Sequence, residues 1–240
     1  MSTAAAGYLR ASKTPWYSLL SILPLAALYE ALALLVNWDS AAELRNGADV
    51  LLRQTLALFG LNTPYLLGAL LAAAIAAAWL WQRRASGSSR VSGTYLLLML
   101  AESLLWGGFL LISLSVADQL LMLPTSDQVL RTAFLAVGAG IYEEGVFRLL
   151  LVSALGTFFR RALDWQRPIA WGLAVTVAAV LFALFHYVGP AGELFGWNSF
   201  GYRCVAGVIL GLLFIFRGFG ITVYAHTFYN LMVLGITTVN

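Results

Sequence analysis

The amino-acid sequence predicts an all-α fold, a polytopic membrane helix bundle with about seven transmembrane helices and one amphipathic helix in the membrane interface. Three observations support this prediction. Hydrophobic residues make up 61% of the 240 positions, charged residues make up only 10%, and the mean hydropathy is +0.84. A soluble domain carries about 25% charged residues, so this chain lacks the polar side chains that would cover a globule of its size.

The composition also excludes other classes of protein. A single cysteine, Cys204, rules out a disulfide scaffold. The formal net charge is +3, and the basic residues stand at the ends of apolar segments rather than in one patch. We therefore expect the lipid bilayer as a partner and no nucleic acid.

Seven apolar segments have the length of a membrane crossing, because a hydrocarbon core of about 30 Å needs about 20 apolar residues per helix. These segments are 16–36, 64–82, 94–117, 131–158, 169–188, 198–216 and 219–238. The fourth is longer than one crossing requires, so it must tilt or protrude. The sequence has no internal repeat, and residues 1–240 are predicted to form a single domain.

The stretch 43–59, between the first two spans, is amphipathic. Arg45, Asp49 and Arg53 share one face at i, i+4 spacing, and the leucines lie largely elsewhere. This pattern is typical of a helix that rests in the plane of the membrane interface.

The distribution of basic residues predicts the orientation of the bundle, since cytoplasmic segments carry an excess of Lys and Arg. With a cytoplasmic N-terminus and an external C-terminus, nine basic residues lie inside, four lie outside, and Arg148 lies within a span. The inner ones are Arg10, Lys13, Arg83, Arg84, Arg90, Arg160, Arg161, Arg167 and Arg217, and the outer ones are Arg45, Arg53, Arg131 and Arg203.

Ionisable residues inside spans are candidates for function, because each costs about 2.5–3.5 kcal/mol to insert at the centre of a helix. The fourth span contains Glu143, Glu144 and Arg148. Glu144 and Arg148 are an i, i+4 pair that can neutralise each other, while Glu143 points about 100° away around the helix axis. The pair is interpreted as structural and Glu143 as available for chemistry. The alternative is that all three only hold helices together.

The two histidines of the chain also fall in predicted spans. His186 follows Phe182 by one helical turn, and Asn230 follows His226 at the same spacing. A lone histidine in an apolar helix is more often a core residue than a catalyst, but this combination favours a site. A carboxylate can take a proton from water, one imidazole can orient that water, and a second imidazole with an amide can stabilise an oxyanion.

In chain order, these residues resemble the three motifs of the CPBP family of CAAX-protease and bacteriocin-processing intramembrane proteases, also called Abi, which includes the Rce1-type prenyl-protein endopeptidases. The resemblance covers residues 131–235, and nothing in residues 1–130 matches the family pattern. The elements that carry it are Glu143-Glu144-x-x-x-Arg148, Phe182-x-x-x-His186 and His226-x-x-x-Asn230, with Gly207 and Gly211 in the sixth span.

The resemblance implies hydrolysis of a peptide bond near the C-terminus of a membrane-anchored protein or peptide substrate, and a place in the inner membrane of a bacterium. By position, Glu143 and His186 would activate water, and His226 with Asn230 would form the oxyanion site. Glu144, Arg148 and Phe182 would support them. The family has been described as metal-dependent and as glutamate-based. We expect no cofactor, with zinc held by Glu143, His186 and His226 as the alternative.

Several alternatives stay open at this stage. A non-catalytic membrane partner, such as an immunity or scaffold protein, can have the same fold. A transporter usually shows repeated halves, whereas the polar cluster here is confined to one half. Glu30 and Glu102 either line the cavity or are paired or protonated, and the turn 189–193 is either a lid over the site or a plain connector.

Overall fold

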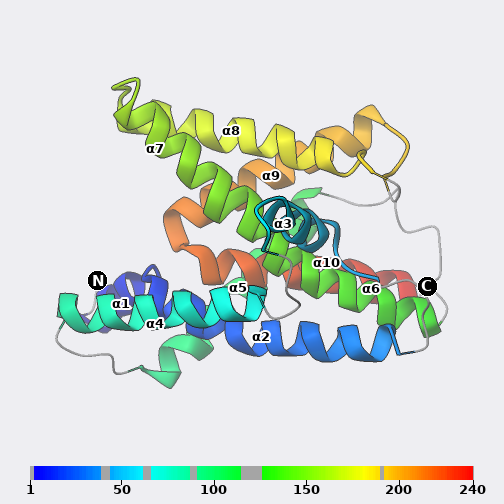
Figure 1. The fold of residues 1–240 in the computed structure, drawn as a ribbon, viewed down its shortest axis with the longest axis horizontal. Coiled ribbons are helices and arrows are strands. Elements are labelled where there is room, and N and C mark those ends of the chain that lie inside the picture. Colours follow the sequence, from blue (N-terminus) through cyan, green and yellow to red (C-terminus); the bar gives the residue numbers. More distant parts are fainter. Residues whose placement is uncertain are drawn as a thin grey trace.

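The structure is a computed structural model of the chain and describes residues 3–38, 44–61, 66–86, 91–114, 126–189 and 192–239. Within these ranges the chain forms helices and connecting segments, and no strand. The helices pack side by side, and the two chain ends lie at opposite ends of the bundle (Figure 1). The predicted all-α membrane bundle is therefore confirmed.

The helices follow the predicted segments. Their bounds are α1 Thr3–Ala11, α2 Pro15–Val36, α3 Gly47–Leu58, α4 Leu66–Ser86, α5 Gly93–Leu114, α6 Ser126–Gly138, η1 Ala139–Glu143, η2 Gly145–Val152, α7 Ser153–Arg161, α8 Arg167–Phe185, α9 Trp197–Arg217 and α10 Phe219–Val239. Over the described ranges, five are long and apolar enough to cross a membrane, namely α2, α5, α8, α9 and α10. The other two predicted spans correspond to α4 and to the run from α6 to α7. Residues 43, 64–65 and 115–117 of the predicted elements lie outside the described residues.

The fourth predicted span differs most from its prediction as one α-helix. The helical run extends from Ser126 to Arg161, and its central part consists of the π-helical segments η1 and η2, separated by Glu144. In a π-helix each N–H bonds to the carbonyl five residues earlier, and such turns are found frequently at functional sites. The wider turn therefore coincides with the Glu143-Glu144 pair.

Glycines allow the motif helices to pack closely. A Cβ atom on Gly140 of η1 would overlap Thr227 and come within 2.8 Å of the Val223 carbonyl of α10. On α9, a Cβ on Gly207 would lie 2.8 Å from the Cβ of Ala179 in α8. Both positions serve close helix contact, as expected for small residues in membrane bundles.

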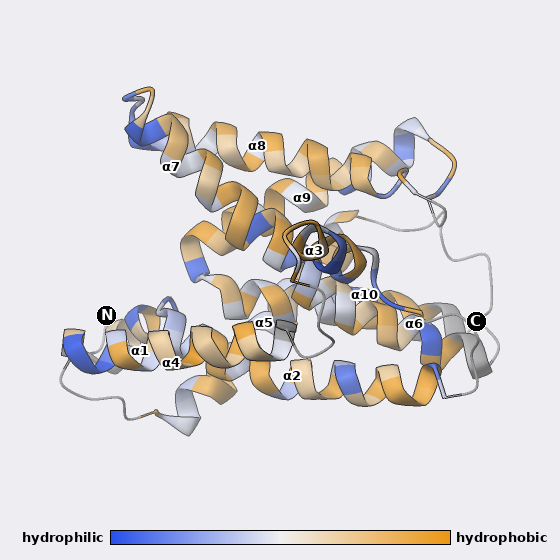
Figure 2. Ribbon diagram, viewed as in Figure 1, coloured by the Kyte–Doolittle hydropathy of each residue, from blue (hydrophilic) through white to orange (hydrophobic). Residues whose placement is uncertain are grey.

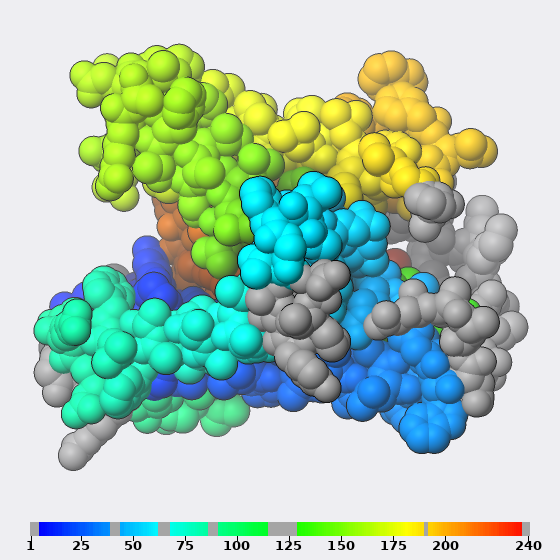
Figure 3. Space-filling model, in the orientation of Figure 1, coloured from blue at the N-terminus to red at the C-terminus, as the bar shows by residue number. Residues whose placement is uncertain are grey.

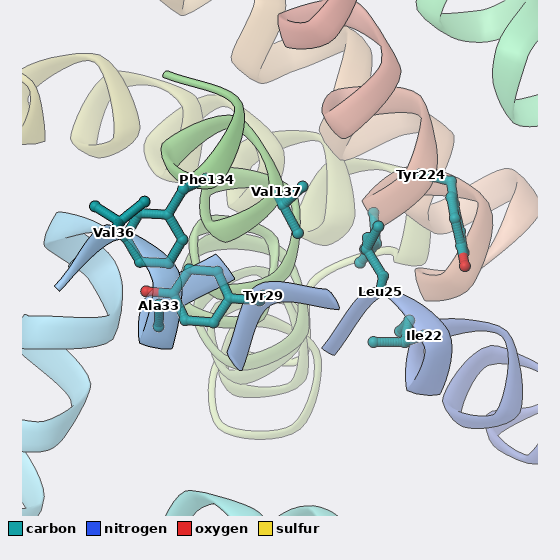
Figure 4. Packing of buried hydrophobic residues seen from close by; sticks show 9 residues of the cluster. Ile22, Leu25, Tyr29, Ala33, Val36, Phe134, Val137 and Tyr224 are labelled. Carbon is teal, nitrogen blue, oxygen red and sulfur yellow. The ribbon is translucent and has the colours of Figure 1, made fainter. Parts of the chain in front are cut away.

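The core beside the motif helix is built by α2, α6 and α10 (Figure 4). The Tyr29 ring of α2 stacks on Phe134 of α6, with 4.6 Å between the ring centroids. Tyr224 of α10 packs in the same cluster, and its hydroxyl donates to the Ser21 carbonyl at 2.7 Å. The first half of the chain thus holds the first and last elements of the motif region in place.

Helix α3 has the predicted polar face, but that face points into the protein. Asp49 is fully buried and pairs with Arg45 at 3.2 Å and with Arg53 at 2.7 Å. Leu58 and Phe59, in contrast, are 85% and 77% exposed. In Figure 3, α3 lies across the middle of the visible face. The predicted i, i+4 face is therefore present, and its charges are paired within the bundle, while apolar side chains at the end of the helix are exposed.

Most of the helical residues are hydrophobic, and many of the hydrophilic residues lie at helix ends and around α3 (Figure 2). The two isolated acids of the first half are paired. Glu30 lies 3.4 Å from Arg45, and Glu102 accepts from Arg217 at 2.7 Å and from the Tyr8 hydroxyl at 2.6 Å. Burial and the bond to Glu102 raise the pKa of Tyr8 in α1, so this phenol remains the donor. Neither acid lines the cavity described below.

Candidate active site

A cavity of about 600 Å³ lies between α5, α6, η1, α8, α9 and α10. The four residues predicted to be catalytic line it together, although they come from three separate segments of the sequence. Its polar lining comprises Asn46, Thr132, Glu143, His186, Glu193, Tyr202, Arg203, His226, Tyr229 and Asn230, and the remainder, which includes the ring of Phe182, is apolar. The cavity is of the size and mixed character of ligand sites in proteins.

Glu143 is 7% exposed and stands at the end of η1. Its Oε1 accepts a hydrogen bond from the Nδ2 of Asn46 at 3.0 Å. Asn46 is the residue that caps the N-terminus of α3. Sequence reasoning missed it as a site residue, because the pattern of a capping Asn before a helix indicates where α3 begins and not which side chain its amide meets.

Glu144 is fully buried and points away from Glu143 toward a second set of partners. Its Oε1 lies 2.9 Å from Nη1 of Arg148 and 2.7 Å from Nδ1 of His226. The predicted i, i+4 pair is therefore confirmed, and the structure adds the histidine to it. Arg148 is 1% exposed, and its guanidinium stacks 4.4 Å from the Phe182 ring centroid, as favoured for a buried cation.

The contact with Glu144 fixes the orientation of the His226 ring. A carboxylate oxygen only accepts, so Nδ1 of His226 carries the proton of the 2.7 Å bond. His226 is 5% exposed and lines the cavity, which leaves Nε2 as the ring nitrogen available to a ligand.

His186 follows the last residue of α8, and its Nδ1 lies 2.9 Å from the Phe182 carbonyl oxygen. Because a carbonyl only accepts, Nδ1 donates, and Nε2 of the neutral ring is an acceptor. The Phe182 ring lies between the two histidines, with its centroid 5.0 Å from the His186 ring and 6.1 Å from the His226 ring. Phe182 lines the cavity, whereas Arg148, which stacks on its ring, does not.

A polar cluster not predicted from the sequence stands beside His186. Arg203 of α9 donates to Glu193 at 2.6 Å and to the Tyr187 hydroxyl at 3.1 Å. The backbone N–H of Glu193 in turn donates to the His186 carbonyl at 3.0 Å. Residues 190–191 of the turn predicted as a lid or connector lie outside the described residues, but its last residue, Glu193, is tied to α9.

The alternative zinc ligands are not gathered as a metal site requires. Over the described ranges, no three side chains of His, Cys, Asp or Glu come together in a group that could hold a metal ion. A structural or catalytic zinc site needs at least three converging protein ligands.

Comparison with models of protein families matches residues 125–232 to one family, described as "Rce1-like: Type II CAAX prenyl endopeptidase Rce1-like". The match includes all of the motif residues from Glu143 to Asn230. Searches of curated proteins and of solved structures found no match. The resemblance drawn from the motifs is confirmed: residues 125–232 of this integral membrane protein match the Rce1-like family, which supports the general fold of CAAX-type intramembrane proteases.

Proposed function

We propose that this protein is an intramembrane endopeptidase that hydrolyses a peptide bond near the C-terminus of a membrane-anchored protein. The observation that carries the proposal is the convergence of Glu143, His186, His226 and Asn230 on one cavity within an apolar bundle. Ionisable groups at membrane depth are costly, and a bundle that needed only packing would be better served by apolar residues there.

In the proposed reaction, Glu143 accepts a proton from a water molecule as the water oxygen attacks the scissile carbonyl carbon. Nε2 of His186, an acceptor in the neutral ring, orients this water. His226 and the amide of Asn230 stabilise the oxyanion of the tetrahedral intermediate. The proton then passes from Glu143 to the leaving nitrogen and the C–N bond breaks, which gives a carboxylic acid and an amine. A proton passes from the new acid to the amine, so the final products are a carboxylate and an ammonium group.

The proposed roles of Glu144, Arg148 and Phe182 are supporting ones. Glu144 orients the ring of His226 through the bond to Nδ1, and Arg148 neutralises the charge of Glu144 in the absence of water. Phe182 lines the cavity and its ring stacks on the guanidinium of Arg148.

The proposal is tested by a search for a processed substrate. C-terminal peptides of membrane proteins are compared by mass spectrometry between cells with and without this chain, and the candidate substrate is then incubated with the purified chain in liposomes. We expect an uncut protein to accumulate without the chain and to be cut by the purified protein alone. Processing that depends on the chain in cells but not in liposomes would instead indicate a non-catalytic partner, such as a scaffold or immunity protein.

We also propose that hydrolysis needs no metal ion, since the base, the water-orienting group and the oxyanion donors are all side chains of the cavity. Activity of the purified protein should then survive prolonged incubation with a strong chelator, and metal analysis should find no stoichiometric zinc. Loss of activity on chelation followed by recovery with zinc would contradict this prediction and assign Glu143, His186 and His226 to metal binding.

The side of the membrane that the site serves follows from the ends of the helices that line it. The cavity residues lie at the end of α8, the beginning of α9 and the second half of α10, on the side of the C-terminus in Figure 1. With a cytoplasmic N-terminus in a bacterial inner membrane, as the basic residues favour, the substrate is cut on the non-cytoplasmic side.

This orientation is tested with two single cysteines in a Cys204→Ala background. Leu194 is 96% exposed beside the cavity, and Leu163 is 44% exposed at the other end of the bundle. A membrane-impermeant thiol reagent added to intact cells should label Leu194→Cys and leave Leu163→Cys unlabelled. The reverse pattern would place the cavity on the cytoplasmic side.

A further inference from the structure

We propose that Asn46 is a positioning residue for the base Glu143, an inference that rests on the proposed function. Asn46 lies in the half of the chain that the family motifs do not cover. Its Nδ2 donates to Glu143 Oε1 at 3.0 Å, and the two residues are only 6% and 7% exposed. A hydrogen bond between buried groups, one of them charged, is among the stronger interactions of its kind.

The orientation of the Asn46 amide is fixed by its second bond. Its Oδ1 accepts from the backbone N–H of Ala48 at 2.9 Å, as the N-cap of α3. Since the oxygen is occupied by an N–H donor, the other end of the amide must be the NH₂ group, and this group faces Glu143. The residue thus performs two separate tasks, one for the helix and one for the carboxylate.

Asn46 is itself held by a buried network. The Tyr29 hydroxyl accepts from the Asn46 backbone N–H at 3.3 Å and donates to Asp49 at 3.0 Å. Gly138, next to η1, makes room for this contact, because a Cβ there would lie 2.6 Å from the Tyr29 ring and 2.8 Å from Asn46. The start of α3 is therefore held against the end of α6 by hydrogen bonds and by close packing.

The consequence for Glu143 is that its two oxygens are no longer equivalent. Oε1 is engaged by Asn46, so the carboxylate cannot rotate freely, and Oε2 is the oxygen presented to water. A base held in one orientation loses less freedom when the reaction begins, and a misplacement of about 1 Å can cost about 100-fold in rate. Asn46 acts through Glu143 and does not itself touch the reacting atoms.

Substitution by Asp separates the two tasks of Asn46. Asp and Ser both cap helices well, whereas Ala does not. A purely structural role predicts that Asn46→Asp and Asn46→Ser resemble the wild type and that Asn46→Ala is the poorest variant. The positioning role predicts the opposite for Asp, because it sets a second carboxylate against Glu143.

We therefore expect kcat to fall by about 10- to 100-fold for Asn46→Ser and Asn46→Ala, and furthest for Asn46→Asp, with KM changed little in each. The control is Gln54→Ala, an exposed position on the same helix, which should behave as the wild type. An active wild-type enzyme whose Asn46→Asp variant keeps wild-type kcat would overturn the inference and leave the proposed function intact.

A measurement that does not depend on activity tests the same contact. The thermal midpoint of the purified protein is compared for Asn46→Asp in the wild-type chain and in the Glu143→Gln chain. We expect Asn46→Asp to lower the thermal midpoint markedly in the wild-type chain and little or not at all in the Glu143→Gln chain. In the Glu143→Gln chain, the new carboxylate can accept a hydrogen bond from the amide that replaces the Glu143 carboxylate. Equal decreases in both backgrounds would overturn the inference. The effect of Asn46→Asp on the thermal midpoint could depend on Glu143 while neither the wild type nor any variant cuts a substrate. That result would refute the proposed function and, with it, the positioning role.

Discussion

Replacement of Glu143 by Gln should abolish hydrolysis and leave the fold intact. The variant removes the only group in the proposed mechanism that accepts the proton of water, and a general base contributes about 10²–10⁴-fold to a rate. The Gln side chain has nearly the same shape, and its carbonyl oxygen can still accept from Asn46 Nδ2, which now lies 3.0 Å from Glu143. The measurements are the single-turnover cleavage rate in liposomes and the thermal midpoint in detergent.

The matched control for this prediction is Asp164→Asn, which makes the same change from acid to amide in the exposed connection between α7 and α8. Asp164 has a φ of 54°, a conformation that Asn adopts readily, so neither activity nor stability should change. A Glu143→Gln enzyme with a rate within a few-fold of the wild type would remove Glu143 from the role of base.

Replacement of Arg148 by Met should instead destabilise the protein strongly. Arg148 and Glu144 are 1% and 0% exposed and lie 2.9 Å apart. Removing one partner of a buried ion pair leaves the other charge without compensation and costs about 3–5 kcal/mol. The measurement is the free energy of unfolding in a denaturant titration of the purified protein.

The control for the ion pair is Arg203→Met, the same substitution at a position whose partner Glu193 is 55% exposed. Pairs with exposed members contribute at most about 1 kcal/mol, so the loss should be several times smaller than for Arg148→Met. The double variant Glu144→Gln/Arg148→Met should recover part of the stability lost by Arg148→Met. An Arg148→Met protein as stable as the control would show that Glu144 is not charged in the native state.

The sequence predicted those parts of the molecule that depend on helical period and membrane length. The i, i+4 spacing of Glu144 and Arg148 was sufficient to predict their ion pair, because both residues lie on one helix. The separate direction of Glu143 was predicted for the same reason. The convergence of Glu143, His186 and His226 on one cavity was favoured by the chemistry of these side chains and implied by the resemblance to a family, because helical spacing alone does not relate residues on different helices.

The remaining features depend on contacts that no local pattern encodes. Asn46 and Glu143 are 97 positions apart in the sequence, and the capping pattern around Asn46 is complete without Glu143. The direction in which the polar face of α3 points could not be predicted either, since amphipathicity defines two faces and not their surroundings. The π-helical segments η1 and η2 were not predicted, because the spacing of apolar residues was compared with the period of an α-helix.

The position of α10 after the other elements of the site in chain order has a consequence for biosynthesis. This helix carries His226 and Asn230 and packs against α5, α2 and η1, which are all made before it. Translation proceeds at about 5–20 residues per second from the N-terminus, so a nascent chain that has reached Glu143 but not His226 has the proposed base and lacks the proposed oxyanion site. Under the proposed function, such a chain is inert toward the membrane proteins around it, and hydrolytic activity begins only when α10 has entered the bundle.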